Sequence, residues 1–155
     1  MRASTLITTT VLTTVLVACA AERDESGQIQ TAGTLDAFAM QVGDCVDDWA
    51  LNATEISDVP GVPCADPHDN EVYALFDLAD GAWPGDEQVD VDADRGCYDR
   101  FEAAIGASYE ESILEYLPIY PSQDSWERVN DREVICLAYH MEYEKLTGTV
   151  LNTGL

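Results

Sequence analysis

Positively charged side chains are scarce in this sequence. Its 155 residues include seven Lys and Arg against 30 Asp and Glu, so the formal net charge is −23. A surface this acidic repels phosphate, which excludes nucleic-acid binding as a function. It also excludes docking on anionic lipid head groups through a basic patch. Because 46% of the residues are hydrophobic, the chain can still bury a core, and its length predicts one folded domain.

The sequence also lacks an apolar run long enough to span a bilayer. The uncharged run from Ala3 to Ala18 is rich in Thr and shorter than the roughly 20 residues that a spanning helix needs. Arg2 precedes this run and small residues end it, which is typical of a secretory signal. We therefore expect residues 1–18 to be a signal peptide.

The end of this segment resembles a bacterial lipobox. Leu16, Val17 and Ala18 precede Cys19, and a lipobox Cys receives a diacylglyceryl thioether and becomes the new N-terminus. Two or more acyl chains, palmitate among them, give stable anchoring. The resemblance implies a lipoprotein on the extracytoplasmic face of the cell membrane. The alternative is an ordinary signal-peptidase site, because Ala18-Cys19-Ala20 also matches the A-x-A pattern.

The five cysteines divide into one for the lipid and four for disulfides. An exported chain meets an oxidising environment, so the four remaining cysteines should pair. Four cysteines allow three connectivities. We favour Cys45–Cys64, which closes a hairpin, and Cys97–Cys136, which joins a helix to a strand. A zinc site is the alternative, but the sequence has no Cys-x-x-Cys and no close Cys-His spacing, so we expect no metal and no cofactor.

The pattern along the chain predicts a tether followed by one domain. Residues 20–40 are polar and show no sustained period, so we interpret them as a flexible tether between lipidated Cys19 and a domain at 41–155. Within the domain, a 3.6-residue apolar period predicts a helix from about Asp90 to Ile105, with Val91 among its inward-facing residues. The predicted fold class is α+β, with a small, mainly antiparallel sheet, one principal helix packed on it, and two disulfides.

Strands are predicted where β-branched and aromatic residues gather. Hydrophobic residues on both faces predict a central strand at 131–143. Pro60 and Gly61 predict an edge strand or a bulged strand at 56–62. The other expected strands cover 40–46, 71–78, 117–120 and 146–150.

The densest polar cluster before a buried strand is Pro67-His68-Asp69-Asn70-Glu71. One hypothesis is a site in which His68 acts as a base or ligand, Asp69 orients it, and Glu71 or His140 lies nearby. That arrangement suits a metal-assisted hydrolase of envelope material. The alternative is a turn whose polar side chains bond to nearby backbone and start the strand. The sequence has no Ser elbow, paired catalytic acids or Gly-rich phosphate loop beside the cluster, which favours the turn.

An acidic motif begins like an EF-hand calcium loop. Asp90, Asp92 and Asp94 have the right spacing, but Arg95 stands where the turn needs Gly, and Phe101 stands where the bidentate Glu belongs. We interpret the motif as an acidic helix N-terminus, where carboxylates favour the positive end of the helix dipole. A cation-binding acidic surface is a further alternative function.

Asp131 and Arg132 precede the last long strand. One interpretation is a pair that binds a partner. The other is that Arg132 pairs with a carboxylate and stabilises the turn, because acids lie close to each of Arg95, Arg100, Arg128 and Arg132.

Short motifs spread over most of the chain point to one family. They are Gly43-Asp44-Cys45-Val46, Val62-Pro63-Cys64, Pro67-His68-Asp69-Asn70-Glu71-Val72-Tyr73, Trp83-Pro84-Gly85, Cys97 with Phe101 and Gly106, Pro121 before Trp126, Asp131-Arg132-Glu133-Val134-Ile135-Cys136, and Leu146-Thr147-Gly148-Thr149. Together they resemble the septum formation domain of actinobacterial surface proteins, from about Val42 to Gly154. Asn130 departs from the pattern, because the family often has Gly before Asp-Arg.

The resemblance implies a role in forming the division septum and supplies no catalytic residues. We therefore expect a non-catalytic, lipid-anchored extracytoplasmic module. Its expected partners are the membrane, reached through Cys19, and an envelope or divisome protein.

Overall fold

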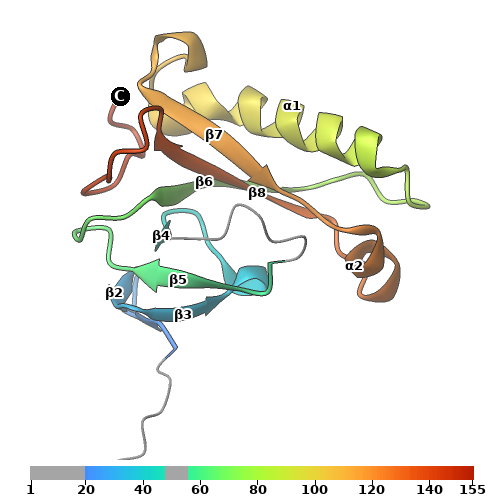
Figure 1. Ribbon diagram of the computed structural model, residues 1–155, viewed down its shortest axis with the longest axis horizontal. Coiled ribbons are helices and arrows are strands. Elements are labelled where there is room, and N and C mark those ends of the chain that lie inside the picture. Colours follow the sequence, from blue (N-terminus) through green and yellow to red (C-terminus); the bar gives the residue numbers. More distant parts are fainter. Residues whose placement is uncertain (1–19, 48–55) are drawn as a thin grey trace, which may run out of the picture.

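A six-stranded antiparallel sheet forms the centre of the computed structural model, which describes residues 20–47 and 56–155 (Figure 1). In sheet order the strands are β3 (Gly33–Asp36), β5 (Asp58–Val62), β4 (Cys45–Val46), β6 (Asn70–Asp77), β8 (Glu133–His140) and β7 (Leu114–Ile119). A smaller sheet pairs β1 (Glu22–Arg23) with β2 (Ile29–Thr31). Helix α1 (Asp86–Ile105) packs on β6 and β7, and the short α2 (Gln123–Arg128) precedes β8. The predicted α+β class with one principal helix is confirmed.

Strand β8 is central, as its sequence predicts. It pairs with β6 on one side and β7 on the other, and Val134 through Ala138 are all buried. Cys136 faces the core under α1, whereas Ile135 and Leu137 face a second core on the opposite side of the sheet. Two buried faces explain why the run from Val134 through Ala138 is apolar at every position instead of at alternate ones.

Helix α1 buries one narrow stripe against the sheet. The stripe repeats every four residues and consists of Val89, Ala93, Cys97, Phe101 and Ile105. The helix begins at Asp86, earlier than predicted, and it ends at Ile105, where the cap residue Gly106 has a φ of 91° that suits glycine. Val91 is 54% exposed, so its predicted inward position is wrong. An earlier start makes Val89 the first member of the stripe, and Val91, two residues later, then points away from the sheet.

Both predicted disulfides are present. Cys45–Cys64 has a Cα–Cα distance of 5.2 Å, and Cys97–Cys136 has one of 5.5 Å, both ordinary values for a disulfide. The first joins β4 to the segment that follows β5. The second joins α1 to β8 within the core.

The prediction of a flexible tether at residues 20–40 is wrong. This segment contains β1, β2 and β3, and β3 pairs with β5 at the edge of the main sheet. Ile29 and Leu35 are 5% and 6% exposed and belong to the second core. β2 and β3 each present one apolar residue and β1 presents none, which is too few to form a recognisable period. Residues 20–40 therefore belong to the fold that the structure describes, ahead of the predicted domain start at residue 41.

The prediction of an edge strand or a bulged strand at 56–62 is also wrong, because β5 is an interior strand with a regular register. β5 lies between β3 and β4, because the segment interpreted as a tether covers its outer side. Pro60 lies opposite Thr34 of β3, and the Pro60 carbonyl oxygen accepts a hydrogen bond from the Asp47 amide. Within β5, the strand β4 pairs with Val62 and Gly61, so Pro60 lies just outside the paired residues of that ladder.

Other boundaries shift by smaller amounts. β7 begins at Leu114, earlier than the predicted Leu117, and follows a short 3-10 turn at Tyr109–Glu111. The predicted strand at 146–150 is reduced to an isolated bridge between Leu146 and His68. Among the described residues, no helix is both long and apolar enough to cross a membrane.

Candidate functional site

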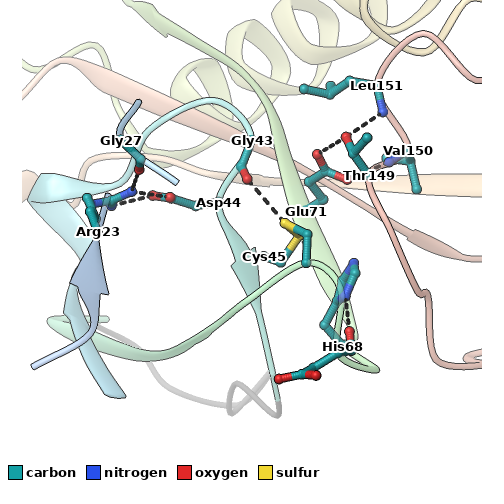
Figure 2. Close-up of a disulfide and its surroundings, with 12 residues drawn as sticks. Arg23, Gly27, Gly43, Asp44, Cys45, His68, Glu71, Thr149, Val150 and Leu151 are labelled. Carbon is teal, nitrogen blue, oxygen red and sulfur yellow. Dashed lines mark hydrogen bonds and ion pairs between the residues drawn. A yellow bond between two sulfur atoms is a disulfide. The ribbon is translucent and has the colours of Figure 1, made fainter. Parts of the chain in front are cut away.

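The polar cluster Pro67–Glu71 lies beside the Cys45–Cys64 disulfide (Figure 2). Glu71 is the second residue of β6 and lies directly opposite Cys45 of β4. This register places the carboxylate on the same side of the sheet as the disulfide. A carboxylate oxygen of Glu71 and the two sulfur atoms all lie within 4.8 Å of one another.

The Glu71 carboxylate holds the C-terminal segment of the chain. Its Oε1 accepts a hydrogen bond of 2.6 Å from the Thr149 hydroxyl, and its Oε2 accepts one of 2.6 Å from the Val150 amide. Glu71 is fully buried, and this burial raises its pKa above the ordinary value. The two hydrogen bonds oppose the rise, because they stabilise the charged form.

His68 is fully buried immediately before β6. Its Nδ1 lies 2.8 Å from the Asp66 carbonyl oxygen, which can only accept, so Nδ1 carries the proton. Its Nε2 is buried without a hydrogen-bond partner among the described residues. The backbone of His68 makes both hydrogen bonds of its bridge with Leu146, at 3.0 and 2.8 Å. A side chain with no exposed surface cannot contact a substrate unless the structure opens.

Asp69 adds an ion pair to the same segment. Its carboxylate lies 2.8 Å from the Lys145 ammonium, which also pairs with Asp47. Hydrogen bonds to Asp47 and Asp69 raise the pKa of Lys145. His68, Asp69 and Glu71 thus each bind a residue between Lys145 and Val150. We name this arrangement the tail clasp.

His140 has different partners from His68. It is the last residue of β8, and its Nδ1 accepts a hydrogen bond of 3.2 Å from the Glu142 amide. The contacts of the described residues do not bring the two histidines to a shared partner. A hydrolase built on His68 and Asp69 therefore lacks an accessible base, because the His68 side chain is fully buried.

Arg132 braces the loop ahead of β8. Its guanidinium lies 3.6 Å over the Trp126 ring, donates to the carbonyl oxygens of Trp126 and Asp131, and is 3.4 Å from the Asp80 carboxylate. The Asp131 carboxylate accepts hydrogen bonds from the Ser125 hydroxyl and the Glu133 amide. Both side chains thus connect α2 to the neighbouring loops, as in the turn-stabilising interpretation.

The acidic motif lies inside α1, and its carboxylates have separate partners. Asp90 accepts from the Tyr120 hydroxyl, Asp94 from Tyr116, and Asp92 from Gln88. A helix does not wrap around a cation as an EF-hand loop does. Among the described residues, the trio with metal-ligand spacing is Cys45, Cys64 and Glu71, and its sulfur atoms are joined to each other.

Sequence reasoning missed one buried charged pair. The guanidinium of Arg23 forms two parallel contacts with the Asp44 carboxylate, which is 2% exposed. Asp44 also accepts a hydrogen bond of 2.7 Å from the Gln41 amide. Asp44 belongs to the Gly43-Asp44-Cys45 motif, but its partner lies in the segment interpreted as a tether. Cys19 lies outside the described residues.

Comparison with protein families agrees with the motifs. A family model described as Septum formation matches residues 10–136. The chain belongs to the septum formation family. No curated protein and no solved structure matches it. The family assignment indicates a division-related envelope protein, and the septum formation family is not a known enzyme family.

The tail clasp joins residues inside the family match to residues outside it. The four disulfide cysteines and the cluster Pro67–Glu71 lie inside the matched range, whereas Lys145 to Val150 follows it. The clasp thus attaches a segment outside the match to the beginning of β6, which lies inside it. The match also begins at residue 10, upstream of Val42, where the motif resemblance begins.

Proposed function

We propose that this protein is a lipid-anchored, extracytoplasmic binding module that acts in the cell envelope during septum formation. Membership of the septum formation family carries the proposal. The two disulfides support it, because such bonds persist in oxidising environments outside the cytoplasm. The partner is an envelope or divisome protein.

The polar residues favour a binding function over catalysis, because their side chains are already engaged in contacts within the fold. The tail clasp holds the C-terminal segment, and Asp131 and Arg132 brace α2. Both groups of contacts stabilise the fold. A catalytic site instead needs groups that a substrate can reach.

The anchor is tested by changing the lipobox cysteine. Cells that express the full chain are labelled with a radioactive or clickable fatty acid. We expect the wild type and Ala18→Gly to incorporate the label, because the lipobox accepts Ala or Gly before its Cys. Cys19→Ala should lose both the label and the processing of the precursor. Labelled Cys19→Ala would overturn the anchor.

The role in division is tested by deleting the gene and imaging septa. We expect septa that are misplaced, delayed or misshapen, with rescue by the wild-type gene. Poorer rescue by Cys19→Ala would connect the anchor to the role. Septa of unaltered position, timing and shape would contradict the proposal.

A further inference from the structure

The residue that follows the proposed lipidation site, Ala20, already belongs to the described fold. Ala20 forms a parallel bridge with Thr34 of β3, and the Ala21 amide donates a hydrogen bond of 3.0 Å to the Thr34 carbonyl oxygen. β3 is the edge strand of the main sheet, so residues 20 and 21 extend that edge. We name the surface formed by residues 20–23 and β3 the anchor edge.

Two further contacts hold the anchor edge to the domain. Ala21 packs against the second core. Arg23 donates a hydrogen bond of 2.8 Å to the Gly27 carbonyl oxygen and pairs with the buried Asp44 carboxylate (Figure 2). Peeling residues 20–23 from the sheet would leave Asp44 buried without its cation, which is strongly unfavourable. The chain beside Cys19 is therefore part of the fold.

We propose that the anchor edge faces the phospholipid bilayer and that the domain stands directly on the outer surface of the membrane. This inference rests on the proposed lipidation of Cys19. Consecutive Cα atoms lie about 3.8 Å apart, so a lipid on Cys19 holds Ala20 and the neighbouring Thr34 at the level of the head groups. A flexible tether over residues 20–40 would instead allow the domain to move roughly 70 Å from the membrane.

The fold then decides which faces remain available to a partner. β3 and β7 are the opposite edges of the sheet, and α1 packs on the β6 and β7 side (Figure 1). Anchoring through β3 directs α1 and β7 away from the membrane. The exposed acids Glu22 and Asp36 lie on the anchor edge and repel anionic lipid, so the covalent anchor and not insertion holds the edge to the surface.

The test measures which part of the full-length lipidated protein touches lipid. A fluorophore is attached at Thr34→Cys on β3 or at Glu102→Cys on α1, both exposed positions. Non-reducing peptide maps confirm that the two native disulfides are intact. Each protein is placed in phosphatidylcholine vesicles that carry a contact-range quencher on the head group. We expect several-fold stronger quenching at Thr34→Cys than at Glu102→Cys.

A linker variant provides the matched control. A Gly/Ser insertion of about a dozen residues between Cys19 and Ala20 restores a flexible tether. It should reduce the quenching at Thr34→Cys to the level at Glu102→Cys. Equal quenching at the two positions without the insertion, in protein shown to carry fatty acid, would overturn the inference and leave the anchor intact. Protein without fatty acid that fails to bind vesicles would overturn the anchor and this inference with it.

Discussion

The Glu71 carboxylate holds the C-terminal segment of the chain in place. It is fully buried and accepts two hydrogen bonds, one from the Thr149 hydroxyl and one from the Val150 amide. Replacing it by Ala leaves a buried donor unpaired and releases the tail. We expect Glu71→Ala to lower the free energy of unfolding by about 2–4 kcal/mol, measured by urea denaturation. Glu144→Ala, an exposed change in the same region, should alter it by less than about 0.5 kcal/mol. Equal losses of unfolding free energy in the two variants would contradict a stabilising role for the tail clasp.

The same carboxylate makes stability depend on pH. Burial raises the pKa of Glu71 in the folded state above its value in the unfolded chain. The folded state therefore binds the proton more tightly, and this contribution to stability falls as pH rises through the raised pKa. Between about pH 5 and about pH 7.5, the wild type should lose more unfolding free energy than Glu71→Gln. If the unfolding free energies of the two proteins change in parallel with pH, burial does not raise the pKa of Glu71.

Gly96 is required by the ring of Phe76. A Cβ added to Gly96 would lie 2.1 Å from the Phe76 ring, on the face of α1 that meets β6. Ala is normally the better helix former by about 1 kcal/mol. Here the clash should outweigh that gain, and Gly96→Ala should destabilise the domain by about 1–3 kcal/mol in thermal unfolding. In a Phe76→Leu background the same change should become neutral or stabilising. Destabilisation in both backgrounds would rule out the ring as the cause.

At the scale of elements, the two disulfides have different tasks. Cys45–Cys64 closes a separation of 19 residues beside the tail clasp, whereas Cys97–Cys136 closes one of 39 and joins α1 to β8. The longer loop restricts the unfolded chain more, by about 0.6 kcal/mol for a doubling of length. Both sulfur atoms of the longer loop also lie in the core, so their loss leaves a cavity.

We therefore expect the Cys97→Ala/Cys136→Ala double variant to lose more stability than Cys45→Ala/Cys64→Ala. Thermal unfolding of the two double variants measures the difference. Equal or reversed losses would show that Phe101 and Ile105 hold the helix without help from the disulfide.

At the scale of the whole molecule, charge opposes folding. A net charge of −23 makes the compact state repel itself. Raising sodium chloride from about 0.01 to about 0.1 M shortens the Debye length from about 30 to about 10 Å and should raise the melting temperature. Choline chloride should act equally, because screening does not depend on the identity of the cation. A saturable, stoichiometric heat on adding calcium would instead indicate a specific site.

Some features of this protein follow from local sequence. Apolar residues at every position of residues 134–138 require two buried faces, and only a central strand offers them. The disulfide pairing followed because a helix stripe and an inward-facing strand position each contained one cysteine. The polar segment Pro67–Glu71 was identified as important, although its sequence did not show that its partners lie between Lys145 and Val150.

Other features were decided only by the tertiary structure. Residues 20–40 form strands because β5 and the second core provide them with partners, and β5 becomes an interior strand because β3 covers it. Arg23 and Asp44 meet because the chain returns to the same place after 21 residues. A strand of two to four residues has too few side chains to show a period, so its identity comes from the ladder that it joins. Long-range pairing supplies the hydrogen bonds and the buried surface that such short segments cannot supply for themselves.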